Sequence, residues 1–248
     1  MVKISTSAPS PLSPTLWPAD AFVWWRSLLF AAALVVMLFV GGIVFAVLWI
    51  RLIGPISAKN PSTAFLLVDQ TVAYIAGFAV LAFLPALARR SWRELGLRAP
   101  TATEVGWGLA GAAAMFIVSQ LIGSIEEHVF HLKVQETAVD LLKSVRGPTL
   151  VLFAFLACIV APVVEELSFR GFALNALLRY LPPVTAGVVS ALLFGLVHGS
   201  WTALAPLAGA GGVLAVVYYR TGALSASMIA HAGFNGIAVL GYILFKIA

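Results

Sequence analysis

Three short groups of polar residues stand inside otherwise apolar stretches in the second half of the sequence. They are the motifs Glu165-Glu166-x-x-x-Arg170, Phe194-x-x-x-His198 and His231-x-x-x-Asn235. An ionisable side chain in a membrane-spanning segment costs about 2.5–3.5 kcal/mol, so each one needs a partner or a function. In each motif two residues are four apart, which places them on one face of a helix. These helix faces are the candidates for chemistry.

The two neighbouring glutamates are expected to have different roles. Glu166 and Arg170 can form an ion pair along one helix face. Glu165 is rotated by about 100° around the same helix, so it does not share this partner easily. We therefore predict that Glu166 and Arg170 form a structural pair, and that Glu165 is a free carboxylate that faces the bundle interior and acts as a general base. Alternatively, all three form a buried charge network that only fixes helix register.

The histidine motifs supply further groups that hydrolysis needs. A single buried histidine such as His198 more often forms interhelical hydrogen bonds than catalyses a reaction, and Phe194 is expected to pack and to shape a pocket. His231 and Asn235, however, place two hydrogen-bond donors on one face. Two such donors aimed at one point could stabilise the oxyanion that develops when an amide is hydrolysed.

Taken together and in this order, the motifs resemble those of the CAAX-protease and bacteriocin-processing family, also called the Abi or type II CAAX prenyl endopeptidase family. That family has Glu-Glu-x-x-x-Arg, then Phe-x-x-x-His, then His-x-x-x-Asn, and the resemblance covers residues 149–243. It implies an intramembrane endopeptidase in which Glu165 and His198 activate the hydrolytic water. It also implies that His231 and Asn235 form the oxyanion site.

A catalytic zinc ion is the alternative to a metal-free site. Glu165, His198 and His231 could supply its two-histidine, one-carboxylate ligand set. A glutamate that acts directly as the base needs no metal, and the sequence has no His-Glu-x-x-His zinc helix. We therefore predict a site without a metal or other cofactor. Cys158, the only cysteine, is expected to be a packing residue.

The same polar residues could instead serve a non-enzymatic membrane protein, such as a proton relay, a transporter or a self-immunity scaffold. Many transporters carry repeats in both halves, whereas the motifs here occupy only the second half, which favours one catalytic cavity. The expected partners are membrane lipid and a protein or peptide substrate, either prenylated or linked to bacteriocins. Nucleic acid is not expected, because the basic residues form no patch with interleaved aromatic residues.

The elements that must position these motifs are membrane-spanning helices. Of the 248 residues, 61% are hydrophobic and 10% are charged, against roughly 45–50% and about 25% in soluble domains. A helix of about 20 apolar residues crosses a hydrocarbon core ~30 Å thick. The sequence predicts an all-α polytopic bundle with seven spans, or eight if one is divided: residues 27–50, 64–88, 104–124, 149–177, 184–198, 203–219 and 224–245.

The chain is predicted to divide into a disordered tail (1–23), N-terminal helices with an outer loop (24–148) and a catalytic core (149–248). Short loops rich in Lys and Arg stay in the cytoplasm, so we place the N-terminus inside and the C-terminus outside. The basic loop on the inner side contains Arg89, Arg90, Arg93 and Arg98. The acidic residues on the outer side are Glu126, Glu127, Glu136 and Asp140. Abundant arginine and alanine favour a bacterial cell membrane.

Overall fold

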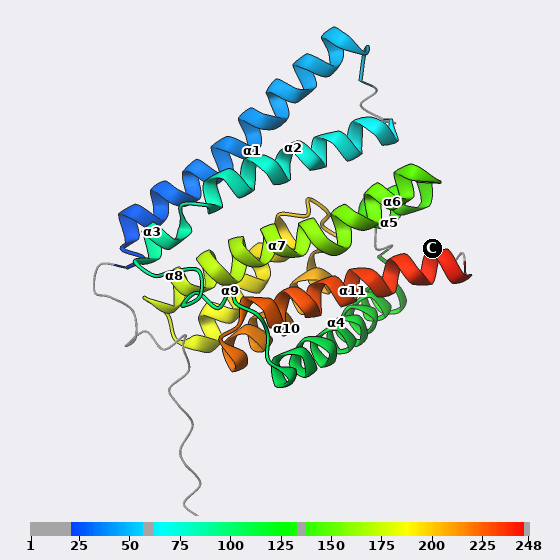
Figure 1. Ribbon diagram of the computed structural model, residues 1–248. Helices are drawn as coiled ribbons and strands as arrows, with labels where there is room; N and C mark the ends of the chain where they lie inside the picture. Colours follow the sequence, from blue (N-terminus) through cyan, green and yellow to red (C-terminus); the bar gives the residue numbers. More distant parts are fainter. Residues whose placement is uncertain (1–20, 57–61, 133–136, 246–248) are drawn as a thin grey trace, which may run out of the picture.

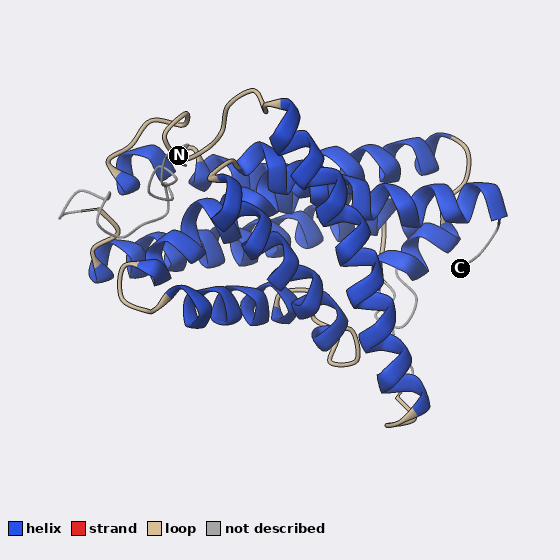
Figure 2. Ribbon diagram, turned by 90° about the horizontal axis from the view of Figure 1, so that it is seen from below, coloured by secondary structure: helices blue, strands red, loops and turns tan. Residues whose placement is uncertain are grey.

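The computed structural model describes residues 21–56, 62–132 and 137–245, in which every regular element is a helix (Figure 2). The α-helices are α1 (Trp24–Leu52), α2 (Thr63–Leu81), α3 (Leu84–Ala88), α4 (Ala102–His128), α5 (Thr137–Ser144), α6 (Pro148–Phe155), α7 (Ala161–Glu166), α8 (Asn175–Leu178), α9 (Pro183–Leu196), α10 (Leu204–Thr221) and α11 (Leu224–Phe245). Two π-helical turns, η2 (Leu156–Val160) and η3 (Leu167–Leu174), join α6, α7 and α8 into one run. The predicted all-α bundle is confirmed. Most of the predicted tail, and Glu136, lie outside the described residues.

Five helical runs are long and apolar enough to cross a membrane. They are Trp24–Leu52, Thr63–Ala88, Ala102–His128, Pro148–Leu178 and Leu224–Phe245. The two other predicted spans coincide with α9, a shorter apolar helix of 14 residues, and with α10, of 18 residues. All seven predicted spans are therefore helical. By length and composition, however, five of them qualify as membrane-spanning.

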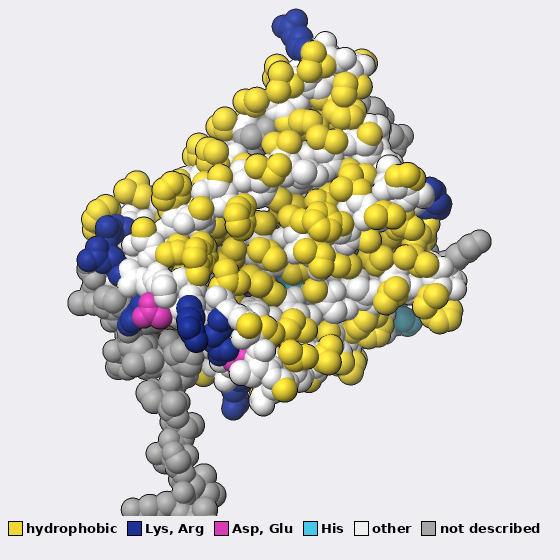
Figure 3. Space-filling view, in the orientation of Figure 1, with side chains coloured by type: hydrophobic (Ala, Val, Ile, Leu, Met, Phe, Trp, Pro, Cys, Tyr) yellow, Lys and Arg dark blue, Asp and Glu magenta, His cyan; other side chains and the backbone are white. Residues whose placement is uncertain are grey.

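The outer faces of these helices carry large apolar side chains that nothing in the described part of the protein covers. Examples are Leu28 and Val47 on α1, Ile117 and Leu121 on α4, and Ile159 in η2. Hydrophobic side chains cover much of the face in Figure 3, while most lysines and arginines lie near its edges. An apolar surface of this extent is a liability in water. In a bilayer it faces acyl chains.

Small residues let the C-terminal helices approach one another closely. A Cβ added to Gly195 of α9 would lie 2.6 Å from the carbonyl oxygen of Leu204 in α10. A Cβ added to Gly108 of α4 would lie 2.6 Å from Cγ2 of Ile229 in α11. Membrane helices associate through such close packing, because lipid provides no hydrophobic drive between them. In Figure 1, α1 and α2 run together along one edge and α4 lies at the other, with the run from α6 to α8 between them.

Side-chain hydrogen bonds mark the two ends of the bundle. At one end Tyr180 Oη donates to the Phe22 carbonyl (3.2 Å), and Tyr218 Oη donates to the Leu95 carbonyl (3.1 Å). At the other end Thr63 Oγ1 donates to Ser144 Oγ (3.2 Å). The seven helical runs therefore alternate in direction, as Figure 1 shows. We call the first end the arginine-rich end; its arginines are Arg26, Arg89, Arg90, Arg93, Arg98, Arg179 and Arg220.

This alternation yields a topology prediction. A fluorescent reporter that matures only in the cytoplasm is expected to be bright when fused after Arg93. It should be dark when fused after Ala248, which lies outside the described residues, because five of the seven predicted spans lie between the two positions and an odd number of crossings places them on opposite sides. Alkaline phosphatase, active only outside, should give the reverse pattern. Both positions on the same side would refute the seven-span arrangement.

Candidate active site

Helix lengths set the depth at which the motifs lie. The 14 residues of α9 rise only about 21 Å, short of a hydrocarbon core of ~30 Å. His198 follows the end of this helix, so by length it stops short of the far side of a core that begins at the arginine-rich end. Glu165 lies about 20 Å along the helical run from Leu178, at the arginine-rich end. The two side chains therefore meet at similar depth.

Two π-helical turns flank the glutamate pair, η2 before α7 and η3 directly after Glu166. The local geometry thus differs from the regular α-helix assumed from the sequence. Such turns are rare, occur often at functional sites, and leave backbone carbonyls without their usual donors. Pro162 has no N–H to donate to the Ala157 carbonyl five residues earlier. Asn235 Nδ2, from α11, donates to that carbonyl at 2.7 Å.

A side-chain amide also donates to backbone carbonyls of η3, and here it comes from the same helical run. Asn175 Nδ2 donates to the Arg170 carbonyl at 2.9 Å and lies 3.0 Å from the oxygen of Gly171. The amide also donates to Tyr218 Oη, 3.0 Å away on α10. A side-chain amide thus replaces part of the missing α-helical hydrogen bonding. It also ties the π-helical turn to the neighbouring helix.

Glu166 is the centre of a buried network that joins three helical segments. Its Oε1 lies 2.9 Å from Arg170 Nη1, and both side chains are fully buried. The same carboxylate accepts hydrogen bonds from His231 Nδ1 at 3.0 Å and from Ser227 Oγ at 2.7 Å. Arg170 Nη2 in turn donates to the Gly211 carbonyl of α10 at 2.7 Å. The predicted ion pair is present, and it also connects η3 to α10 and α11.

Glu165 has a different environment. Its side chain is 19% exposed, and its Oε1 accepts a hydrogen bond from Tyr74 Oη of α2 at 3.3 Å. Its Oε2 is buried and lies 3.9 Å from Nε2 of His198 and 3.9 Å from Nε2 of His231. These distances are too long for direct hydrogen bonds. One oxygen of the carboxylate is therefore anchored, and the other faces two imidazole rings.

The hydrogen bonds on the far sides of the two rings set their proton positions. His198 Nδ1 lies 2.7 Å from the Phe194 carbonyl, and His231 Nδ1 lies 3.0 Å from Glu166 Oε1. A carbonyl and a carboxylate can only accept, so each Nδ1 carries a hydrogen and donates it. In its neutral form each ring then presents an unprotonated Nε2 to Glu165.

Phe194 is buried and packs against both histidines and the buried arginine. Its ring centroid is 4.9 Å from that of His198 and 5.7 Å from that of His231. The Arg170 guanidinium carbon lies 4.9 Å from the same centroid. One aromatic ring therefore contacts both imidazoles and the buried cation. This placement agrees with the packing role expected of Phe194.

The structure brings Glu165, His198 and His231 together, whereas Asn235 contacts the backbone of η2. One amide hydrogen of Asn235 is used by the Ala157 carbonyl. Its second amide hydrogen has no partner among the described residues. The oxyanion role of Asn235 stays a prediction.

Two residues of the site were not predicted from the sequence. Tyr74 reaches Glu165 across 91 positions of the chain, and it belongs to no motif. The one feature of the sequence that could have pointed to Tyr74 is its phenol group within an apolar span. Ser227 carries a usable signal, because it stands four residues before His231 and therefore shares its helix face.

A zinc site requires suitable ligand atoms at suitable separations. Two unprotonated Nε2 atoms and a carboxylate are suitable ligand types. Ligand atoms about 2.0–2.1 Å from one tetrahedral ion lie about 3.3–3.4 Å apart, and the observed 3.9 Å separations are wider. Among the described residues, no group of three or more His, Cys, Asp or Glu side chains is placed to hold a metal ion. The metal-free site stays a prediction.

Comparison with known proteins bears on the same segment. Residues 147–237 match the family model described as type II CAAX prenyl endopeptidase Rce1-like. All three motifs lie inside this range. The resemblance to the CAAX-protease family is thereby confirmed. Tyr74 lies outside the matched segment, so the family model does not cover this contact to Glu165.

Two bacterial proteins are similar over a longer part of the chain. “Putative membrane peptidase YdiL” of Bacillus subtilis (strain 168) is 25% identical over 172 residues, which cover 69% of this chain and 70% of that protein. “Membrane-embedded CAAX protease MroQ” of Staphylococcus aureus (strain USA300) is 26% identical over 154 residues, or 59% of this chain and 62% of that protein. No solved structure matches. The chain is therefore similar to bacterial membrane peptidases of the CAAX type.

The buried pair yields a stability prediction. Glu166→Gln keeps the size of the side chain but leaves Arg170 as a buried cation without its counter-ion, a defect that costs about 3–5 kcal/mol. The purified variant is expected to unfold at a clearly lower temperature in detergent. The double variant Glu166→Leu, Arg170→Met should recover much of the stability while staying inactive, because His231 loses its acceptor. A Glu166→Gln protein as stable as the wild type would contradict the structural role of the pair.

Proposed function

We propose that the protein is an intramembrane endopeptidase that cleaves a peptide bond with a water activated by Glu165 and His198. The family resemblance supports a membrane protease. The observation that carries the mechanism is the placement of Glu165 Oε2, which is 3.9 Å from Nε2 of both His198 and His231. Atoms 3.9 Å apart can both lie within about 2.8 Å of one water oxygen. A single water therefore fits between the base and the imidazole.

In this mechanism the water donates one hydrogen bond to Glu165 Oε2 and the other to His198 Nε2. Glu165 takes a proton as the water oxygen attacks the scissile carbonyl carbon. A C–O bond forms, and the π electrons of the carbonyl move onto its oxygen. When the tetrahedral intermediate collapses, the C–N bond breaks and protonated Glu165 gives its proton to the departing nitrogen. The products are a carboxyl terminus and a free amine.

His231 stabilises the oxyanion once it carries a second proton. Its Nδ1 hydrogen is directed to Glu166, so only a protonated Nε2 can donate to substrate. The second amide hydrogen of Asn235 supplies a further donor. Such donors are more effective in a site from which bulk water is excluded.

Tyr74 acts as a positioning residue. Its hydroxyl holds Oε1 of Glu165, which leaves Oε2 as the oxygen that faces the histidines. The substrate class proposed is a peptide segment of a membrane-associated protein, either a prenylated C-terminus or a bacteriocin-type peptide. The site lies within the bilayer depth, so such a substrate reaches it from the membrane or its surface.

The catalytic test compares matched variants. Glu165→Gln keeps the size of the side chain but cannot take a proton from water. Cleavage is expected to fall by about 10²–10⁴-fold, the usual value of general-base assistance, with thermal stability near that of the wild type. His198→Ala should lose a similar factor, and the double variant should lose much less than the product, because both residues act on one water. Tyr74→Phe should lose less than Glu165→Gln, because it removes one hydrogen bond and leaves the carboxylate in place.

The substrate is identified in the same experiment by comparing the protein termini of membranes that contain wild-type protein with those that contain Glu165→Gln. New termini present only with the wild type support hydrolysis. A Glu165→Gln protein that cleaves these substrates at the wild-type rate would remove the proposed base. A wild-type protein that produces no termini would favour the non-enzymatic alternative.

The metal-free mechanism has a separate test. The purified protein is expected to keep its activity after exhaustive chelation, because Glu165 and His198 polarise the water directly. Activity is measured on the substrate before and after chelation, with metal content determined in parallel. Loss of activity that one equivalent of zinc restores would establish the zinc alternative.

A further inference from the structure

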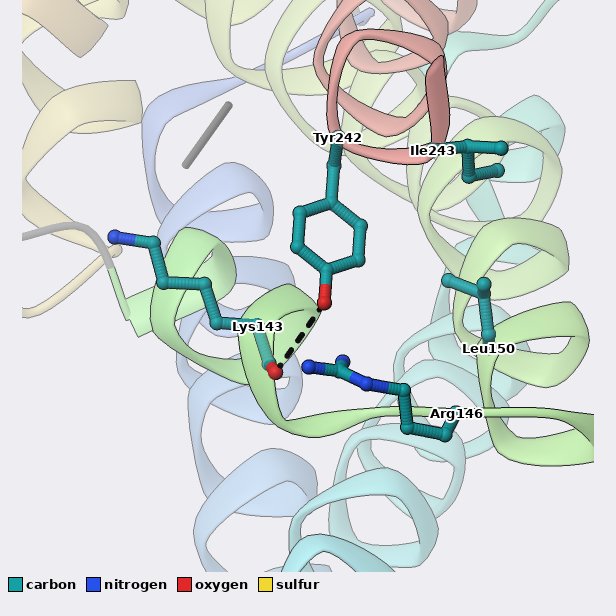
Figure 4. A pocket seen from close by; sticks show the side chains of 5 residues that line it. All are labelled: Lys143, Arg146, Leu150, Tyr242 and Ile243. Atoms are coloured by element: carbon teal, nitrogen blue, oxygen red, sulfur yellow. Dashed lines mark hydrogen bonds between the residues drawn. The ribbon is translucent and has the colours of Figure 1, made fainter. Parts of the chain in front are cut away.

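A cleft with a basic rim opens at the end of the bundle opposite the arginine-rich end. It has a volume of about 450 Å³, and its lining residues are Lys143, Arg146, Leu150, Tyr242 and Ile243. Figure 4 shows Tyr242 projecting from α11 toward the backbone of α5, with the guanidinium of Arg146 beside it. The cleft thus lies between the end of α5, the start of α6 and the end of α11. It is separate from the proposed active site.

The cleft contains two cations, Lys143 and Arg146. Within the described part of the chain, neither Lys143 nor Arg146 forms an ion pair with a carboxylate. Arg146 is nevertheless held in place, because its Nη1 donates to the Val145 carbonyl at 2.6 Å and its guanidinium carbon lies 5.4 Å from the centroid of the Tyr242 ring. Tyr242 Oη also donates to the Lys143 carbonyl at 3.5 Å. The cleft therefore presents a positioned guanidinium and an exposed ammonium group to an anion.

The surroundings of the cleft are apolar. Leu150 and Ile243 form part of its lining. Next to them, Val151 of α6 is 71% exposed and Leu244 of α11 is 69% exposed. Tyrosine and basic side chains at the end of membrane spans lie at the level of the lipid headgroups. A ligand that pairs an anionic group with long apolar chains matches both parts of this surface.

We propose that this cleft binds the phosphodiester group of an anionic phospholipid, with its acyl chains against α6 and α11. The phosphate accepts hydrogen bonds from Arg146 and Lys143, and a net negative headgroup complements two cations that have no acidic partner among the described residues. Because α6 continues into Glu165 and α11 carries His231, a bound lipid clamps together the ends of two helices of the proposed active site. The proposal does not depend on catalysis.

The test uses the full-length protein in an uncharged detergent. Dioctanoyl phosphatidylglycerol is titrated and followed by native mass spectrometry and by the unfolding temperature, and dioctanoyl phosphatidylcholine is the comparison lipid. We expect tighter binding of phosphatidylglycerol and a rise in unfolding temperature. Lys143→Gln with Arg146→Gln should weaken its affinity about 30-fold, given ~1 kcal/mol for each cation near a headgroup and a factor of ten for each 1.4 kcal/mol. Lys143→Gln alone, on an exposed side chain, should weaken it about 5-fold.

Three results would overturn the proposal. The matched control, Arg51→Gln with Arg93→Gln, removes two exposed charges elsewhere. An equal loss of affinity in this control would show that the net charge of the protein, and not the cleft, attracts the anionic lipid. Inorganic phosphate that binds as tightly as the lipid would remove the role of the acyl chains. A peptide with a free C-terminal carboxylate that displaces the lipid at lower concentration would assign the cleft to substrate.

Discussion

The buried pair of Glu166 and Arg170 is the interaction on which the C-terminal half depends. In a bilayer an unpaired charge is costly, and a buried ion pair is stable only when hydrogen bonds satisfy its remaining donors and acceptors. Glu166 accepts from Arg170, His231 and Ser227, and Arg170 also donates to Gly211. Three helical segments are thereby held in one register. The same network that resolves a buried charge also orients an imidazole of the proposed active site.

The backbone on both sides of Glu166 departs from regular α-helix. Two π-helical turns bracket α7, and each carries a carbonyl that a side-chain amide satisfies: Asn235 at Ala157 and Asn175 at Arg170. Pro162 accounts for one of these, since it has no N–H to donate. The arrangement gives Asn235 a structural contact in addition to its proposed part in binding the oxyanion. A variant at this position is therefore informative only when stability and turnover are measured together.

Bilayer depth also shapes the chemistry. Because α9 has only 14 residues, His198 lies beside Glu165 and not at the far end of the bundle. Tyr74 arrives from α2, in the half of the chain that the family model does not cover, and anchors one oxygen of the Glu165 carboxylate. The N-terminal helices thus contribute to the site itself. At the far end of α11, the cleft beside Tyr242 connects the same helices to the lipid headgroup region.

By itself the sequence determined the all-α membrane fold, the positions of the seven helical runs and the Glu166–Arg170 pair, because hydropathy and four-residue spacing are local signals. Local spacing also placed Phe194 and His198 on one face. Only the tertiary structure decided that His231 is bound to Glu166, that Asn235 turns to the Ala157 carbonyl, and that Tyr74 reaches Glu165. These contacts join segments 65, 78 and 91 residues apart. Such pairings depend on which helices pack together and at what height, and spacing within one helix does not determine its partner in the bundle.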